Sequence, residues 1–249
     1  MPHILEVDTM AEQLFTIPVN EAFEGSSECP FCEMYKKIEE SAIEFTLGPS
    51  YMEDDNREVT DKLGFCRDHI LKLYGRKNRL GLALMMNTHM NKLIRDMKAA
   101  ADQGPGEKGG FLSRKTGESP VVKLIHEVNS TCFVCNRINP VYDRYIDTFF
   151  YLWKKDPEFK DKVAGCKGFC LDHYARLYEE GVKRLGKSEL DHFLNLLNKV
   201  FFENIMRVDA DIAWFIDKFD HRNADKPWNN SRDALPRSIT KVNSVIPEE

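Results

Sequence analysis

The sequence has no apolar run of about 18 residues or more, and its first residues lack the basic and apolar segments of a secretory signal. It also has no excess of basic residues, because its formal net charge is −5. These absences argue against a membrane span, export and a nucleic-acid partner. We therefore expect a protein of the cytoplasm, a reducing compartment where paired cysteines more often bind metal than form disulfides.

Strand-like alternation of apolar and polar residues is also missing, whereas apolar residues recur at three- and four-residue steps in many segments. This periodicity predicts an all-α fold. One predicted helix, which begins after a break at Gly75 or Gly81, is apolar over most of its circumference because Leu80, Leu84, Met90 and Ile94 widen its apolar stripe. A helix of this kind is predicted to lie in the interior. The acidic segment 50–62 is predicted to be a connector with at most a short turn.

The seven cysteines divide into two similar sets and one extra residue, Cys166. A Cys-x-x-Cys pair is followed by Gly-Phe-Cys-x-Asp-His in each half of the chain, which indicates an internal duplication. We expect each half to form its own four-ligand set. The first set is Cys29, Cys32, Cys66 and His69, and the second is Cys132, Cys135, Cys170 and His173.

Three cysteines and one histidine are the ligands of a structural tetrahedral zinc site. Each Cys-x-x-Cys pair and each Cys-x-x-His pair lies at the start of a predicted helix, where unpaired amides and the helix dipole favour thiolates. We therefore predict two zinc ions per chain, each clasping two helix N-termini. Iron–sulfur clusters, a thioredoxin-like redox pair and metal-free buried cysteines are the alternatives. Cys166 is interpreted as a free thiol near the second set, with redox sensing or ligand exchange as the alternative.

Other candidate residues lie outside the cysteine motifs. His89 is flanked by methionines on an apolar stripe, and it is either a hydrogen-bonded core residue or part of a ligand pocket. The segment from 214 to 233 is rich in charges, amides and aromatic residues. Asp217, Arg222 and Trp228 are its candidate binding residues, unless the segment only wraps and anchors the helices. No catalytic residues are identified.

Glycine and proline divide the chain into four parts. We predict a first zinc-clasped helical module at 1–101, a glycine-rich linker at 102–119, a second module at 120–219 and a polar tail at 220–249.

Three further segments accompany the cysteine motifs: Leu82–Met85 with Thr88 and His89, Phe150–Phe159, and Phe219–Trp228. Together they resemble a bacterial family of unknown function that carries the same duplicated motifs over nearly the whole chain. The resemblance implies the duplicated architecture, brings no established activity, and adds weight to His89 and the tail as sites. Some similar proteins are labelled as transporter substrate-binding proteins, but this chain has no export signal and no two-lobed α/β pattern.

These observations favour a non-enzymatic cytoplasmic zinc protein that binds or scaffolds an unidentified protein or small molecule, because no nucleophile–base pair, phosphate-binding loop or open metal position is evident. One alternative is an enzyme or small-molecule binder with a pocket around His89 and the 214–233 tail. A second alternative is a metal or redox sensor.

Overall fold

The computed structural model describes residues 15–105 and 118–247, and these residues form helices, turns and loops without a β-strand. The all-α prediction is confirmed. Most of the predicted linker at 102–119 lies outside the described residues. No helix among the described residues is long and apolar enough to cross a membrane.

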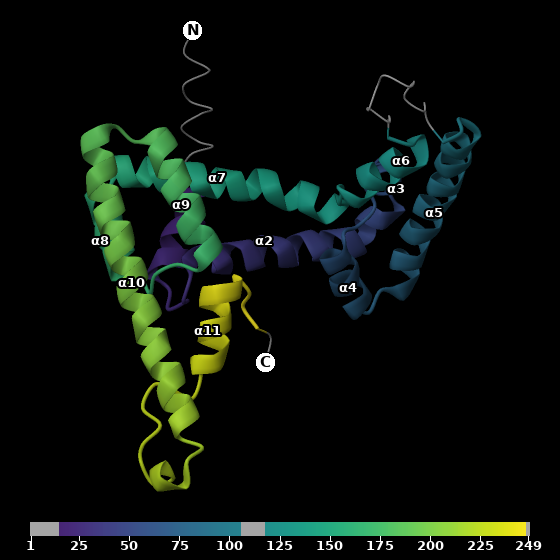
Figure 1. Ribbon diagram of the computed structural model, residues 1–249. Helices are drawn as coiled ribbons and strands as arrows, with labels where there is room; N and C mark the ends of the chain where they lie inside the picture. Colours follow the sequence, from purple (N-terminus) through teal and green to yellow (C-terminus); the bar gives the residue numbers. More distant parts are fainter. Residues whose placement is uncertain (1–14, 106–117, 248–249) are drawn as a thin grey trace, which may run out of the picture. The chain divides into compact units, whose positions relative to one another are not determined.

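Residues 15–24 are helical. The elements that follow are α2 (Pro30–Leu47), η1 (Pro49–Met52), α3 (Asp54–Leu63), α4 (Arg67–Gly75), α5 (Arg79–Asp102), α6 (Pro120–Asn129), α7 (Phe133–Lys155), α8 (Pro157–Gly165), α9 (Leu171–Arg184), α10 (Lys187–Asp217), η2 (His221–Asn223) and α11 (Ala234–Asn243), of which Figure 1 labels the α-helices. The predicted connector 50–62 is largely helical, as α3. Asp54 and Asp55 lie in its first turn, where carboxylates stabilise the helix dipole.

The chain divides into two compact units, and both boundaries fall inside helices. Of the described residues, unit 1 contains those up to Lys37 and from Tyr142 onward, and unit 2 contains those between Ile38 and Val141. Each unit therefore contains residues of both sequence halves, so the units do not coincide with the modules 1–101 and 120–219.

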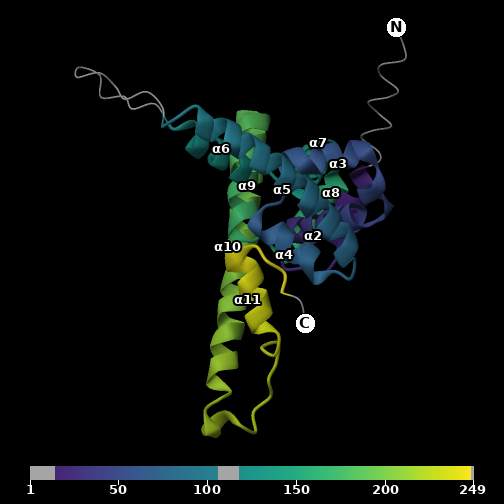
Figure 2. The same ribbon diagram turned by 90° about the vertical axis from the view of Figure 1, so that its right-hand side faces the viewer.

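The core of unit 1 is aromatic. Phe149 of α7 lies centrally, with its ring centroid 5.5 Å from those of Phe31 and Phe159. Phe169 and Trp153 are completely buried in the same cluster. Helix α11 returns alongside α10, as both views show (Figures 1 and 2). The aromatic core thus packs the first turn of α2 against the loop that leads into α9.

In unit 2, α5 packs against α3 and α6. Leu82 and Met85 are buried on one side of α5, with Leu73 of α4 also in the interior. The prediction of an interior helix is wrong for the opposite side. The side chains there are 67% exposed at Leu80, 53% at Met90 and 49% at Ile94.

Candidate metal sites

The structure brings all eight predicted ligands into two clusters, each with three cysteines and one histidine. Site 1, in unit 1, consists of Cys29, Cys32, Cys170 and His173. Site 2, in unit 2, consists of Cys66, His69, Cys132 and Cys135. The grouping expected from sequence proximity is therefore wrong, because each Cys-x-x-Cys pair meets the Cys-x-x-His pair of the other half.

The lengths of the helices explain this exchange. Helix α2 has 18 residues and leads the chain about 27 Å away from Cys29. The next helix, α3, has 10 residues and spans only about 15 Å. After the second Cys-x-x-Cys pair, α7 has 23 residues and α8 only 9. In each half, a long helix followed by a short one separates the two ligand pairs.

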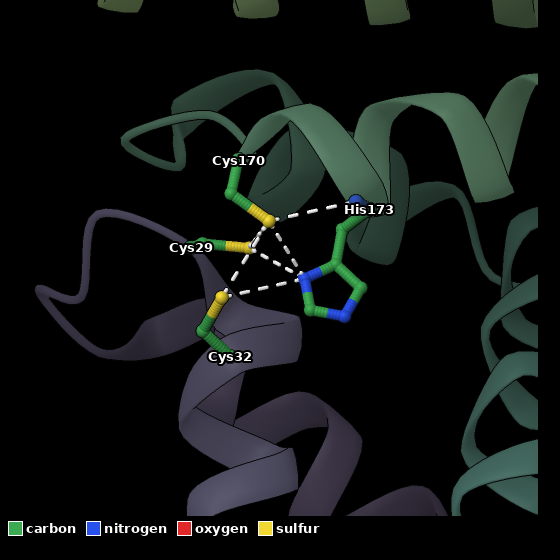
Figure 3. Close-up of side chains that lie close together, drawn as sticks. All are labelled: Cys29, Cys32, Cys170 and His173. Carbon is green, nitrogen blue, oxygen red and sulfur yellow. Dashed lines mark hydrogen bonds between the residues drawn. The ribbon is translucent and has the colours of Figure 1, made fainter. Parts of the chain in front are cut away.

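Site 1 joins the N-termini of α2 and α9 (Figure 3). Cys29 precedes α2 and Cys32 lies in its first turn, whereas Cys170 caps α9 and His173 lies in its first turn. The Cys170 Sγ atom lies 3.7 Å from Cys29 Sγ and 3.5 Å from Cys32 Sγ. The Nδ1 atom of His173 lies 3.3 Å, 3.4 Å and 2.9 Å from the sulfurs of Cys29, Cys32 and Cys170.

Site 2 joins the N-termini of α4 and α7 in the same manner. Cys66 caps α4, and Cys132 directly precedes α7. The Nδ1 atom of His69 lies 3.2 Å, 3.4 Å and 3.3 Å from the sulfurs of Cys66, Cys132 and Cys135. The Cys66 and Cys135 sulfurs are 3.9 Å apart. The prediction that each cluster clasps two helix N-termini is confirmed.

Both clusters have the dimensions of a tetrahedral metal site. Bond lengths of about 2.3 Å to sulfur and 2.0–2.1 Å to nitrogen imply edges of about 3.8 Å between sulfurs and about 3.6 Å between sulfur and nitrogen. The sulfur–sulfur distances of 3.5–3.9 Å agree with these edges, and most sulfur–nitrogen distances are only slightly shorter. The cysteines are free, and a disulfide would need sulfurs about 2.05 Å apart. Either cluster could therefore hold one metal ion with four protein ligands.

Without metal, the close ligands perturb one another's protonation. Hydrogen bonds with Cys29 and Cys32 lower the pKa of Cys170. Hydrogen bonds with Cys170 and Cys29 raise the pKa of Cys32. Burial lowers the pKa of His173, but hydrogen bonds with Cys170 and Cys29 outweigh it and raise that pKa to about 10. A thiolate next to an imidazolium is thus favoured in the metal-free cluster.

Site 2 shows the same pattern. Burial raises the pKa of Cys132, but the hydrogen bond with His69 outweighs it and lowers that pKa to about 6. Burial raises the pKa of Cys135 to about 12. Burial lowers the pKa of His69, yet hydrogen bonds with Cys132 and Glu39 raise it to about 10. A metal ion would have to displace protons from both sites.

The two histidines differ in what contacts the rest of the ring. In site 2, Nε2 of His69 lies 3.1 Å from Oε1 of Glu39, a buried carboxylate whose other oxygen pairs with Lys72. A carboxylate in this place orients the ring and leaves Nδ1 free to bind a metal. In site 1, the His173 ring packs against two aromatic rings instead, with its centroid 5.6 Å from that of Phe31 and 5.7 Å from that of Tyr142.

A glycine with positive φ precedes the Cys-x-x-His pair of each site, Gly64 at +57° and Gly168 at +89°. A side chain at either position would be strained. A Cβ on Gly64 would also lie 2.7 Å from Nε2 of His89, so this histidine packs directly on the loop that leads to Cys66. The Nδ1 atom of His89 lies 2.8 Å from the carbonyl oxygen of Asp61. His89 therefore supports the loop of site 2.

Lys241 of α11 was not identified from the sequence, although it is completely buried beside site 1. Its ammonium group donates to the carbonyl oxygens of Glu28 and Lys167, and it lies 3.2 Å from the Glu28 carboxylate. Glu28 precedes Cys29, and Lys167 precedes the Gly168 loop. Lys241 therefore ties together the two segments that carry the ligands of site 1. No local sequence signal marks it, because a lysine in a polar tail is normally solvated.

The candidate binding residues lie in different units, His89 in unit 2 and Asp217, Arg222 and Trp228 in unit 1. Arg222 is exposed and pairs with Asp220, two residues away. The Trp228 ring lies 5.9 Å from that of Phe215. Lys218, which is buried, donates to the carbonyl oxygens of three residues of this loop, Asn223, Ala224 and Lys226. These contacts hold the tail together. Ligand binding by the candidate residues His89, Asp217, Arg222 and Trp228 stays a prediction.

Cys166 is buried and belongs to neither cluster. Burial raises the pKa of its thiol to about 11, which keeps it protonated and unreactive at neutral pH. This environment agrees with the interpretation of Cys166 as a free structural thiol.

The fold and the two clusters define a class of all-helical proteins with paired Cys3His sites. The chain belongs to DUF6062, a family of unknown function, whose model matches residues 10–249. No curated protein and no solved structure matches the chain.

Proposed function

We propose that the protein binds two structural zinc ions, one in each site, and that the ions hold its helices in place for a non-enzymatic binding or scaffolding role. The observation that carries this proposal is the completeness of both ligand sets. Three thiolates and one imidazole in a tetrahedron favour zinc, and a fourth protein ligand leaves no position for water or substrate. The cysteine chemistry fits a reducing compartment such as the cytoplasm.

Metal analysis of purified protein tests the identity and the number of the ions. We expect about two zinc ions per chain, one for each cluster. A visible iron–sulfur absorption band, or full folding of a protein without metal, would contradict the proposal.

Proton release provides a second test. In metal-free protein, the pKa of about 10 at His69 and His173 keeps both rings protonated at pH 7. Relative to an unfolded histidine near 6.5, each contributes stability to the metal-free form below about pH 6.5 and loses it as the pH rises through about 10. Zinc must displace these protons and those of Cys32 and Cys135. Calorimetry in buffers of different ionisation enthalpy should show at least two protons released per ion, and zinc affinity should fall as the pH falls.

Metal exchange at site 2 is a second candidate function. Cys66 and Cys135 are half-buried there, whereas all three cysteines of site 1 are buried. A mild chelator should then remove one zinc ion much faster than the other. Equal release rates for both ions would contradict a sensing role.

A further inference from the structure

One side of α5 in unit 2 is exposed and largely apolar. Helices α3, α4 and α6 lie together beside α5 (Figure 1), and its residues Leu82, Met85 and His89 are buried. The exposed side carries a row of residues at alternating steps of four and three, which places them along one line on the helix surface. This row, the α5 ridge, consists of Leu80, Leu84, Asn87, Asn91, Ile94 and Lys98, all of which are exposed. A surface helix normally turns polar side chains to water, so a row of exposed apolar residues indicates a docking surface.

The α5 ridge has nearly the same residue order in both directions. Asn87 and Asn91 form its centre, and Leu84 and Ile94 lie three residues outside them, one toward each end. A second copy of α5, turned antiparallel about a two-fold axis level with residue 89, therefore places Leu84 against Ile94 and Asn87 against Asn91. The same pairs recur on both sides of the axis, which is the self-complementarity that an isologous dimer requires.

The two central asparagines are only partly hydrogen-bonded within one chain. The Nδ2 atom of Asn91 donates to Oδ1 of Asn87 at 3.2 Å. The N–H groups of Asn87 and the side-chain oxygen of Asn91 have no partner among the residues that the structure describes. An amide offers two N–H donors and an acceptor oxygen. In the antiparallel pair, Asn87 donates to the Asn91 oxygen of the second copy and the two-fold axis repeats this bond, so the four amides satisfy one another.

The charge at one end of the α5 ridge favours the antiparallel arrangement over the parallel one. Parallel helices in register would bring Lys98 against Lys98 of the second copy, and like charges repel. In the antiparallel pair, Lys98 lies over Leu80 of the second copy, where its aliphatic stem covers the leucine and its ammonium group stays in water. The macrodipoles of antiparallel neighbouring helices also attract each other.

We propose that the α5 ridge docks on the α5 ridge of a second copy of this chain, antiparallel about the two-fold axis level with residue 89. Residues 80–98 span about 27 Å of helix. Two helices of this length form a small interface, near the lower limit of about 1,000 Å² for specific association. The dimer should therefore be weak and reversible, with a Kd on the order of 10–100 µM. This self-association goes beyond the proposed binding role, and it does not depend on which metal fills either site.

Sedimentation equilibrium of the metal-loaded full chain tests the proposal at concentrations from about 1 µM to about 500 µM. We expect the mean mass to rise from that of one chain, 28.9 kDa, toward twice that value. Ile94→Glu places a carboxylate against Leu84 of the second copy, so the dimer should be at least about tenfold weaker. Leu71→Glu, at a leucine of α4 that is 62% exposed, is the matched control and should dimerise as the parent does.

A pair of opposite charges tests the orientation. Leu84→Lys should weaken the dimer as Ile94→Glu does. The double variant should associate at least about tenfold more tightly than either single variant, because each new ammonium group then faces the new carboxylate of the second copy. In a parallel dimer like charges would face each other instead, and the double variant would associate most weakly.

The proposal is overturned if the protein keeps the mass of one chain at about 500 µM, if Ile94→Glu dimerises like the parent, or if the double variant gains nothing over the single variants. Cosedimentation of single chains with vesicles of anionic lipid would assign the α5 ridge to a membrane surface instead. Zinc content and circular dichroism, measured on the same samples, distinguish a lost dimer from a misfolded variant.

Discussion

Sites 1 and 2 have the same ligand types at the same positions on their helices, yet their surroundings stabilise them by different means. In site 1 the cysteines are buried, His173 packs against two aromatic rings, and Lys241 ties together the two ligand-bearing segments. In site 2 two cysteines are half-buried, Glu39 orients His69, and the backbone N–H of Phe133 donates to the Gly64 carbonyl oxygen at 2.9 Å. Identical ligand motifs therefore do not imply identical stability or exchange.

The largest expected effect comes from cysteine variants that test the exchanged grouping. Cys29→Ser and Cys170→Ser should each remove the same zinc ion, so the double variant should still retain one. Cys29→Ser combined with Cys66→Ser should lose both ions. Because the binding free energy of a structural zinc ion is about 10–16 kcal/mol, each lost ion should also unfold its unit.

Metal analysis and hydrogen exchange measure these two consequences. If each sequence half formed its own site, the Cys29/Cys170 double variant would lose both ions and the Cys29/Cys66 double variant would retain one. One retained ion in the Cys29/Cys66 double variant would therefore disprove the arrangement described above.

The next effect should be confined to unit 1. Lys241→Met removes the ammonium group that binds two carbonyl oxygens and the buried Glu28 carboxylate. We expect a loss of about 3–5 kcal/mol in the free energy of unfolding, because a buried charge loses a partner. Denaturant unfolding measures this loss. Lys187→Met, at an exposed lysine at the start of α10, is the control and should change little.

A smaller effect is expected at the loop that His89 supports in unit 2. Gly64→Ala places a Cβ 2.7 Å from His89 Nε2 at a position with φ of +57°. Strain and overpacking together should destabilise the protein by about 2–3 kcal/mol in thermal or denaturant unfolding. Gly75→Ala is the control, since its Cβ would have no neighbour within 4 Å. Similar stabilities for the two variants would refute the supporting role of His89.

The smallest effect should be specific to the metal affinity of site 2. Glu39→Gln weakens the hydrogen bond that orients His69, so we expect zinc to bind site 2 about 10–100-fold more weakly, with site 1 unchanged. Chelator competition that resolves the two ions measures this difference. Glu40→Gln, at the exposed neighbouring residue, should leave both affinities unchanged. An equal loss at both sites would show that Glu39 acts on the whole fold.

Several features of the fold and the site could be predicted from the sequence. The three- and four-residue periodicity predicts α7 and α10, and Ser119-Pro120 marks the start of α6. The eight ligands are identifiable because few residue types bind metal and their spacing at helix starts is local. The connector prediction for 50–62 failed because α3 is polar on most of its surface and buries Thr60 but no large apolar residue.

The sequence by itself determined the ligand types, the helices that carry them and the two glycine turns that lead into Cys66 and Cys170, because these depend on neighbouring residues. Only the tertiary structure decided which pairs form one cluster. Closing the 141-residue separation between Cys29 and Cys170 costs only about 1 kcal/mol more than closing a span within one half. The long helices and the packing around Phe149 and Lys241 outweigh so small a difference, and these contacts join residues far apart in the chain.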